Sequence, residues 1–169
     1  MKPIDSIRIC RADYFNPGHA AALVAMLDAY ARDPMGGGAG LSDYALAHVA
    51  AEWAKLPQAF SVLAFDGVGD EKPVGLVNCM QGFSTFACKP LINVHDVAVL
   101  AAYRGLGIAE RMLALVELEA RSRGACKLTL EVLSGNAMAM RLYGRVGFAD
   151  YALDPAAGHA RFMQKLLYE

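Results

Sequence analysis

Residues 104–107 read Arg-Gly-Leu-Gly and stand between an apolar run and a segment with helical apolar spacing. A helix that begins at Gly107 exposes unpaired N–H groups and carries about half a positive charge there. Glycine has no Cβ, so a ligand can reach the backbone at Gly105 and Gly107, and Arg104 adds a full positive charge. The pattern predicts a site for a phosphate or pyrophosphate, with a tight turn that binds nothing as the alternative.

A second candidate lies near the C-terminus, where Asn136 and Tyr143 are seven residues apart in a segment with helical spacing. Their side chains are expected to share a helix face, about 10 Å apart along the axis, with the small Ala139 between them. That face suits one extended ligand. A phenol has an ordinary pKa near 10, so Tyr143 can donate a proton at neutral pH. The alternative is a core tyrosine with a satisfied hydroxyl.

Two consecutive polar residues, His95 and Asp96, interrupt the apolar strand predicted over Ile92–Leu100. Successive side chains of a strand point to opposite faces, so we expect the two residues to have different environments. Imidazole has an ordinary pKa near 6.5, which suits a base at neutral pH. The alternative for His95 is a buried ring bonded to a backbone carbonyl, and Asp96 is a candidate anchor for a neighbouring loop.

The elements that must position these residues follow from apolar periodicity and from turn residues. The predicted strands are Ser6–Arg11, Phe60–Phe65, Val74–Met80, Ile92–Leu100, Lys127–Leu133, Phe148–Ala152 and Ala160–Leu167. The predicted helices are Ala20–Arg32, Asp43–Leu56 with Ser42 as its cap, Gly107–Arg123 and Asn136–Val146. A strand, helix and strand in succession require a parallel pair, whereas hairpins require antiparallel pairs. We therefore predict an α/β (α+β) domain with a mixed, mostly antiparallel sheet of about seven strands and four helices.

Composition narrows the class of protein. The chain has 169 residues, 56% of them hydrophobic, and a formal net charge of −1. Without a basic tract, nucleic acid is not expected as a partner. No apolar signal segment or membrane-length window is present, so we expect no membrane partner and a cytoplasmic location. The four cysteines and four histidines lack the close spacing of metal ligands, so no metal is expected.

The segment Arg104–Ala109 resembles the R/Q-x-x-G-x-G/A signature of the GNAT superfamily of N-acetyltransferases. Val99 stands five residues before Arg104, as the strand-ending valine of that family does. A second family pattern, N-x-x-A-x-x-L-Y-x-x-x-G-F, is matched by Asn136, Ala139, Leu142, Tyr143, Gly147 and Phe148. This chain departs from the family at Gly144, where a better helix former is usual, and at Ala109, where glycine is commoner.

The resemblance implies a GNAT-like acyl-CoA N-acyltransferase fold over residues 1–169, as one domain, with acetyl-CoA as the acyl donor. Backbone amides from Gly105 to Glu110 are then expected to hold the pyrophosphate, and the backbone at Val97 and Val99 the pantetheine arm. In the family, a bulge in that strand opens the slot for the arm. The implied donor-binding residues are Val97, Ala98, Val99, Arg104, Gly105, Leu106, Gly107, Ile108, Ala109, Glu110, Asn136 and Ala139.

Acyl transfer from a thioester to an amine needs a neutral amine, a stabilised carbonyl oxygen and a proton for the leaving thiolate. The resemblance implies Tyr143 as the acid. In some members of the family a histidine at the place of His95 is a proposed proton acceptor. A backbone N–H near Val97 is expected to bind the carbonyl oxygen.

The acceptor pocket is expected from the first two helices and the strand loops, here Met35–Gly38, Trp53 and the loop Gln81–Lys89. Phe83 and Phe86 either line an apolar wall there or are ordinary core aromatics. Asp33 and Asp43 either attract a cationic amine or are solvated surface carboxylates. The acceptor itself and the length of the acyl group stay open.

The predicted function is that of an acetyl-CoA-dependent N-acetyltransferase. It would acetylate a primary amine of a small molecule or peptide, by direct attack on the thioester. The alternative is a non-catalytic acyl-CoA-binding regulatory domain. A nucleotide-binding domain rests on the glycine loop alone and lacks the repeated βαβ units and the acidic ribose-binding residue. Homodimers are common in the family, so a homodimer is included among the expected partners.

Overall fold

The structure, a computed structural model, describes residues 6–67, 72–151, 156 and 160–167. Contacts along the chain divide it into two compact units, Met1–Leu130 and Glu131–Glu169. Each unit is described by itself below. The predicted single domain over residues 1–169 stays a prediction.

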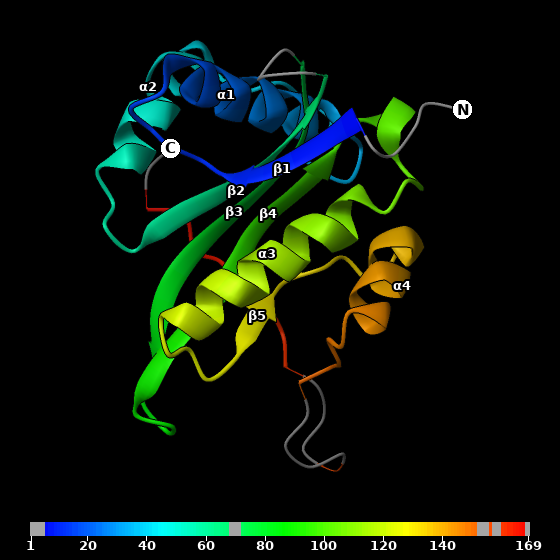
Figure 1. Cartoon of the computed structure of the whole chain (residues 1–169). Helices are drawn as coiled ribbons and strands as arrows, with labels where there is room; N and C mark the ends of the chain where they lie inside the picture. Colours follow the sequence, from blue (N-terminus) through cyan, green and yellow to red (C-terminus); the bar gives the residue numbers. More distant parts are fainter. Residues whose placement is uncertain (1–5, 68–71, 152–155, 157–159, 168–169) are drawn as a thin grey trace. The chain divides into compact units, whose positions relative to one another are not determined.

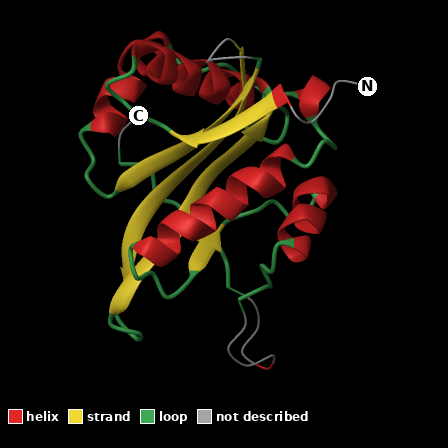
Figure 2. Cartoon of the chain, in the orientation of Figure 1, coloured by secondary structure: helices red, strands yellow, loops and turns green. Residues whose placement is uncertain are grey.

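The first unit contains a sheet, three α-helices and one 3-10 turn among its described residues (Figures 1 and 2). Its strands are β1 (Ile7–Arg11), β2 (Ala59–Asp66), β3 (Lys72–Ser84), β4 (Lys89–Val99) and β5 (Leu128–Leu130). Its helices are α1 (Pro17–Arg32), α2 (Asp43–Ala54) and α3 (Ile108–Ser122), with the 3-10 turn η2 at Ala101–Tyr103. The second unit contains α4 (Ala137–Arg145). As far as α4, this is the predicted order of elements.

The sheet has the strand order β1-β2-β3-β4-β5. Neighbours from β1 to β4 are antiparallel, and β4 pairs with β5 in parallel. The parallel pair is connected through α3, as a crossover connection requires. The prediction of a mixed, mostly antiparallel sheet is therefore confirmed.

The number of strands is five in the described part of the chain, not about seven. Residues 148–151 and 160–167 lie in the last two predicted strands and form none, while residue 152 lies outside the described residues. The apolar side chains of Phe162, Met163, Leu166 and Leu167 are exposed. Periodicity reports a pattern of side chains, whereas a strand also needs a neighbour for its N–H and C=O groups.

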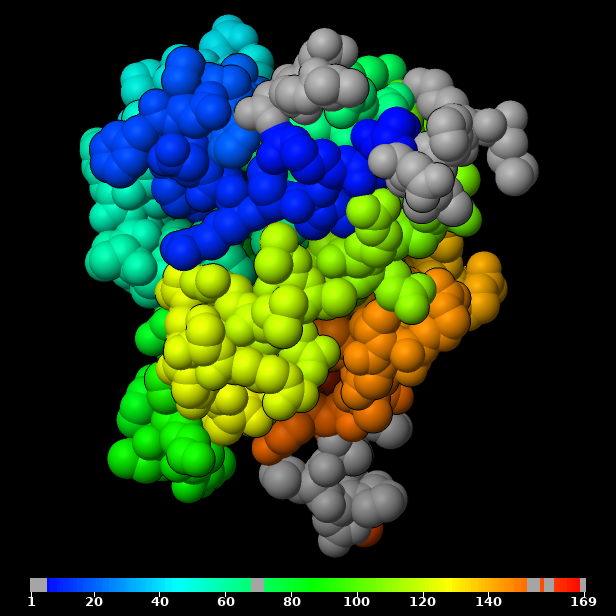
Figure 3. Space-filling view, viewed as in Figure 1, coloured from blue at the N-terminus to red at the C-terminus, as the bar shows by residue number. Residues whose placement is uncertain are grey.

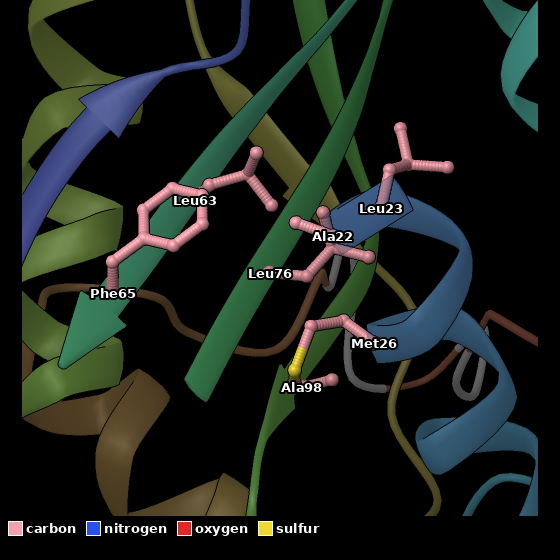
Figure 4. Packing of buried hydrophobic residues seen from close by; sticks show 7 residues of the cluster. All are labelled: Ala22, Leu23, Met26, Leu63, Phe65, Leu76 and Ala98. Carbon is pink, nitrogen blue, oxygen red and sulfur yellow. The ribbon is translucent and has the colours of Figure 1, made fainter. Parts of the chain in front are cut away.

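Helices cover both faces of the sheet. Figure 1 shows α1 and α2 behind the sheet and α3 in front of it. Leu63 and Leu76 belong to a buried cluster packed under α1 (Figure 4). On the other face, a Cβ built on Gly75 would lie 2.8 Å from Met112 Cε of α3 and 3.1 Å from Ala64 Cβ. Because Leu63 and Ala64 are consecutive in β2, they point to opposite faces, as the two helix layers require.

A buried hydrophobic cluster holds α1 against the sheet, on the face that α1 and α2 cover. Its members are Ala22, Leu23, Met26, Leu63, Phe65, Leu76 and Ala98 (Figure 4). Trp53 and Val49 of α2 pack against this cluster and are partly buried. Burying each large aliphatic side chain contributes about 1.5–3 kcal/mol, so the cluster holds α1 and α2 firmly to the centre of the sheet.

On the opposite face, α3 lies along β1, and Figure 3 shows their surfaces in contact. The Arg111 guanidinium donates to the carbonyl of Ile7 (2.9 Å), and Arg11 forms an ion pair with Glu119 (3.4 Å). The buried residues of α3 are Ile108, Met112, Leu113, Val116 and Ala120. The helix begins one residue after its predicted start at Gly107.

The first helix begins three residues before its predicted start. Asn16 is its N-cap, and its side-chain oxygen accepts from the N–H groups of Gly18 (2.8 Å) and His19 (3.4 Å). Pro17 occupies the first helical position, where a missing N–H costs nothing. The sequence Asn-Pro-Gly is therefore a helix start.

His19 makes the stability of this packing depend on pH. Its ring is buried against Phe65, and its Nδ1 accepts from the N–H of Asp13 (3.0 Å). Burial, followed by the positive charge of Arg8, lowers the pKa of His19 below its ordinary value. The stabilisation by neutral His19 is therefore complete above about pH 6.5 and is lost as the pH falls through the folded-state pKa.

We expect the free energy of unfolding to fall on acidification below about pH 6.5, by at most about 1.4 kcal/mol per pH unit from this one group. Urea unfolding of the wild type and of His19→Gln, across pH 7 to 5, measures the difference between their profiles. The variant should show a shallower decline. Parallel profiles would show that His19 is not the group responsible.

Candidate active site

The loop before α3 has the backbone of an anion cradle. Gly105 and Gly107 both lie in the left-handed region, with φ of +78° and +72°. Gly107 is the N-cap of α3, and no side chain caps that helix. Side chains cap the other described α-helices, namely Asn16 for α1, Ser42 for α2 and Asn136 for α4. The first N–H groups of α3 are therefore available to a ligand.

The space beside this loop is open on the glycine side. A Cβ built on Gly105 or Gly107 meets no heavy atom within 4 Å. Ile108 is buried and fixes the start of the helix, while Leu106 and Ala109 are half-buried and Glu110 is exposed. The residues predicted to hold a pyrophosphate thus form one continuous loop and first turn, and their geometry fits that group.

Arg104 has a different role from the one expected of a free cation. Its Nη2 pairs with Asp33 Oδ2 (2.6 Å), and its Nε donates to the carbonyl of Val99 (3.0 Å). The hydrogen bond from Arg104, followed by that from the N–H of Met35, lowers the pKa of Asp33. Asp33 is therefore an ion-pair partner rather than a solvated carboxylate, and Arg104 connects the loop to the end of β4.

The same ion pair reaches the loop predicted to face the acceptor. Asp33 caps the C-terminus of α1, and its carbonyl accepts from the N–H groups of Gly36 (2.8 Å) and Gly38 (3.1 Å). Met35–Gly38 is therefore folded back on Asp33. The ion pair of Arg104 with Asp33 therefore connects the loop before α3 with the loop Met35–Gly38.

The backbone of β4 presents Val97 and Val99 away from β3. The N–H of Leu100 donates to the carbonyl of Val74 in the strand register (3.0 Å). In an antiparallel ladder, hydrogen-bonded and non-hydrogen-bonded residues alternate. Ala98 therefore points its polar backbone groups toward β3, whereas Val97 and Val99 point theirs toward the other edge.

That edge is shared with β5 over a short stretch. Residues Ile92–Val94 pair with Leu128–Leu130, and the described ladder between β4 and β5 stops there. The contact of Arg104 with the carbonyl of Val99 agrees with the direction inferred for that residue. This part of β4 has the arrangement expected for binding an extended amide-containing chain by its backbone.

A bulge in β4 places His95. In the register with β3, Asp96 pairs with Asn78 and Val94 with Cys79, so His95 is the extra residue. Its side chain is exposed, which rules out the buried-histidine interpretation. Its ring stacks on Trp53 of α2 at a centroid distance of 6.3 Å.

His95 is exposed and Asp96 half-buried, so their environments differ as expected, yet the bulge brings both beside one group of side chains. Both reach one cluster: His95 through the ring of Trp53, and Asp96 through Asn78, whose neighbour Ser61 accepts from Trp53 (3.2 Å). Strand alternation predicts opposite faces, but an extra residue in one strand resets that alternation. The predicted base and the carboxylate beside it therefore lie beside the same group of side chains.

The polar side chains under this site were missed by sequence reasoning. Ser61 and Asn78 are fully buried in β2 and β3, and Asn78 Nδ2 donates to Asp96 Oδ2 (3.0 Å). Ser61 Oγ donates to Asn78 Oδ1 (2.6 Å) and lies 2.9 Å from the hydroxyl of Tyr14. A lone Ser or Asn within an apolar strand was the available signal, since a buried polar side chain needs a partner.

The β3–β4 hairpin changes the interpretation of another predicted acceptor segment. Most of Gln81–Lys89 belongs to the two strands, and the hairpin tip protrudes from the unit (Figure 1). Phe83 is 59% and Phe86 100% exposed, so neither is a core aromatic. Asp43 lies in the exposed first turn of α2. Of the predicted acceptor residues, Trp53 is the one in contact with His95.

The second unit holds the remaining predicted residues. Asn136 is the N-cap of α4, and its Oδ1 accepts from the N–H of Ala139 (3.1 Å). Tyr143 follows two turns later, is buried and meets the ring of Phe148 edge-on at 5.8 Å. The predicted helix and its shared face are thus present, and the catalytic role of Tyr143 stays a prediction.

No three His, Cys, Asp or Glu side chains come together as a metal site would require, in the parts of the chain that the structure describes.

Among the described residues, none of the helices has the length and apolar content needed to cross a membrane.

Comparisons with known proteins point to one family. The sequence model of the acetyltransferase (GNAT) family matches residues 23–148. Streptothricin acetyltransferase of Streptomyces lavendulae is 36% identical over 86 residues, which cover 49% of this chain and 46% of that protein. The chain therefore spans about half the length of this curated relative.

Solved structures agree in fold. A probable acetyltransferase superposes with a TM-score of 0.78 at 17% identity, over 96% of this chain and 99% of its own. AAC(6')-Iy, solved with the bisubstrate analogue CoA-S-monomethyl-acetylneamine, has a TM-score of 0.71 at 16% identity, with coverage of 95% and 98%. At these identities the likeness is one of fold. The family model spans most of the chain, and on that ground the chain belongs to the acetyltransferase (GNAT) family.

Proposed function

We propose that the chain is an acetyl-CoA-dependent N-acetyltransferase that acetylates a primary amine of a small molecule or peptide. The observation that carries the proposal is the start of α3. There, two left-handed glycines leave the helix without a side-chain cap, next to a β4 edge with outward-facing backbone at Val97 and Val99. A pyrophosphate and an amide-containing arm need these two features side by side.

The residues present suit acetyl-CoA. The amides of Gly105–Glu110 would hold the pyrophosphate, and the backbone of Val97 and Val99 would hold the pantetheine amides. One solved structure of the same fold binds an analogue built on CoA, which supports this donor. When bound, acetyl-CoA supplies an acetyl thioester, and the N–H of Val97 or its neighbour would stabilise the carbonyl oxygen.

The chain's own side chains would move the protons. A new C–N bond forms as the amine attacks the thioester carbon, and the C–S bond breaks. His95 would take the proton that the amine loses, directly or through a water. Tyr143 would give a proton to the sulfur that leaves. The role of Tyr143 rests on the sequence pattern that begins at Asn136.

The preferred candidate for the acceptor is a small-molecule amine, and a peptide amine is the alternative. The name of the Streptomyces lavendulae relative supports a small molecule, since it gives streptothricin as what that enzyme acetylates. A cytoplasmic location, expected above from the sequence, and a homodimer, implied by the family resemblance, also belong to the proposal.

Release of free thiol tests the proposal. The purified chain is incubated with acetyl-CoA and a panel of amines that includes streptothricin, simple alkylamines, diamines and lysine peptides. Thiol release above the amine-free rate, with the acetylated amine seen by mass spectrometry, is the expected result. Calorimetric binding of CoA without acetylation of any amine would favour the non-catalytic acyl-CoA-binding domain instead.

Tyr143→Phe removes one hydroxyl and is expected to lower kcat by roughly ten- to a thousandfold, at or below the usual general-acid range. A thiol is a fair leaving group, with a pKa near 8.5 for cysteine as a rough guide, so the loss should not exceed that range. The dissociation constant of acetyl-CoA should barely change, because the interaction is made only in the transition state.

Single-turnover rates measure this effect even if product release limits turnover. Tyr151→Phe is a matched control, since it removes the hydroxyl of a 58% exposed tyrosine in the same unit. An unchanged single-turnover rate in Tyr143→Phe, or a loss of acetyl-CoA affinity with normal turnover, would end the acid assignment.

A further inference from the structure

Three polar side chains lie side by side across the centre of the sheet. The strand register pairs Ser61 with Asn78, and Asn78 with Asp96. Ser61 and Asn78 are 0% and 1% exposed, whereas Asp96 is half-buried. A buried polar side chain destabilises the core unless it is hydrogen-bonded, so the partners of Ser61 and Asn78 need to be identified.

The hydrogen bonds of this row run in one direction. Ser61 Oγ donates its single proton to Asn78 Oδ1 (2.6 Å), so at the 2.9 Å contact the hydroxyl of Tyr14 must be the donor to Ser61. Trp53 Nε1 donates to the hydroxyl of Tyr14 (3.0 Å) and to Ser61 Oγ (3.2 Å). Burial raises the pKa of Tyr14, which keeps its phenol a donor at neutral pH.

This series of hydrogen bonds ends at the carboxylate of Asp96, which only accepts. Asn78 Nδ2 donates to Asp96 Oδ2 (3.0 Å), and this bond fixes the orientation of the carboxylate. The other oxygen, Oδ1, makes no hydrogen bond to any residue that the structure describes, and no lysine or arginine there pairs with Asp96. A half-buried carboxylate held at one oxygen and open at the other is arranged to receive a donor.

The surroundings of Asp96 favour a cationic donor. Trp53 stacks on His95, the residue next to Asp96, and so brings an indole ring to the site. Tyr30 of α1 packs against the buried cluster that includes Ala98, and burial, followed by the negative charges of Asp96 and Asp33, raises its pKa and keeps its phenol neutral. Aromatic faces attract an ammonium group, and their attraction adds to that of a carboxylate.

The reacting amine itself is a poor match for Asp96. That amine must lose a proton before it attacks, and an alkylamine with a pKa near 10.4 already costs about 4.6 kcal/mol to neutralise at pH 7. A neighbouring carboxylate favours the charged form and would raise this cost. The cation that suits Asp96 is therefore a different amino group, one that keeps its proton throughout the reaction.

We propose that Asp96 binds a second, permanently protonated amino group of the acceptor, so that the acceptor is a small molecule with at least two amino groups. This inference rests on the proposed function. One amino group lies at His95 and is acetylated, while the other donates to Asp96 Oδ1 and is not. The hydrogen-bonded side chains of Trp53, Tyr14, Ser61 and Asn78 hold Asp96 in place and are positioning residues.

Matched amines test the inference. Putrescine and cadaverine are compared with butylamine and pentylamine, which have the same carbon counts and one amino group fewer. We expect kcat/KM to be about ten- to a hundredfold higher for the diamines, as one charge-assisted hydrogen bond allows. In Asp96→Asn, which keeps an acceptor for Asn78, the ratio of diamine to monoamine kcat/KM should fall at least about tenfold.

Asp43→Asn is the matched control, because it removes the same charge from the exposed first turn of α2. It should keep the wild-type ratio. Calorimetric titration of putrescine into the chain saturated with CoA gives a readout independent of turnover, and thermal melting shows whether Asp96→Asn folds. The wild-type comparison of diamine with monoamine needs no variant at all.

The outcomes separate the two proposals. Acetylation of amines with no preference for diamines, or with a ratio unchanged by Asp96→Asn, would overturn the inference and keep the proposed function. Asp96-dependent binding of putrescine without any thiol release would overturn the proposed function and keep the inference. If putrescine does not bind and no thiol is released with any amine, both proposals are overturned.

Discussion

Gly107→Val is expected to weaken binding of CoA by at least about a hundredfold, or about 2.7 kcal/mol. Two effects act together. Gly107 has a φ of +72°, a conformation that a β-branched residue adopts only with strain. The new side chain would also occupy the open space beside the loop, where a Cβ meets no heavy atom within 4 Å and where the phosphates are proposed to approach.

Calorimetric titration of CoA measures this loss, and Gly124→Val is the matched control. Gly124 follows the other end of α3, has a φ of +69° and also meets no heavy atom within 4 Å. Both variants carry the same backbone strain, so both should melt earlier than the wild type. Only Gly107→Val should lose CoA. Equal CoA affinity in the two variants would place the phosphates elsewhere.

The start of α3 could be predicted because all of its signals are local. A strand-ending Val99, two glycines and a helical apolar stripe fall within one stretch of sequence, and the structure has a strand, a left-handed loop and a helix there. Local signals also predicted the order of elements and the parallel pair of β4 and β5. Backbone sterics and apolar periodicity act over a few residues, so a single sequence contains them.

The arrangement around His95 could not be predicted in the same way. The family resemblance implies a bulge in this strand, but the bulge exists only in the pairing of β4 with β3, and no property of residues 92–100 taken alone requires it. The partners of Asp96 and Arg104 are likewise distant in sequence: Asn78 for one and Asp33 for the other. Side chains that meet across strands or between loops are fixed by tertiary packing, which periodicity does not contain.

Arg104 shows how such a contact changes a functional interpretation. As an isolated residue beside two glycines it predicts an extra positive charge for a phosphate. In the structure its guanidinium pairs with Asp33, so the anion binding proposed for this loop rests mainly on the amides of α3. The same pair links the α1–α2 loop, which the family resemblance predicts at the acceptor pocket, to the loop before α3.

His95 should have the largest effect on turnover of any side chain in the site. Its ring is exposed at the bulge and stacks on Trp53, so it is held in place and still reachable by an amine or a water. An alkylamine is protonated at pH 7, and removing that proton before it can attack costs about 4.6 kcal/mol. A base at this position supplies an acceptor for that proton.

We expect His95→Ala to lower kcat/KM by roughly 10²–10⁴, the usual range for a lost general base. The base must be neutral to act, so wild-type kcat/KM should fall toward low pH, and that acid limb should change shape in the variant. Added imidazole should restore part of the rate. His48→Ala is the matched control, because His48 is also exposed and stacked on an aromatic ring, that of Tyr44 at 4.2 Å. Wild-type kcat/KM with an unaltered acid limb in His95→Ala would mean that the ring serves only to pack against Trp53, and that a water chain takes the proton.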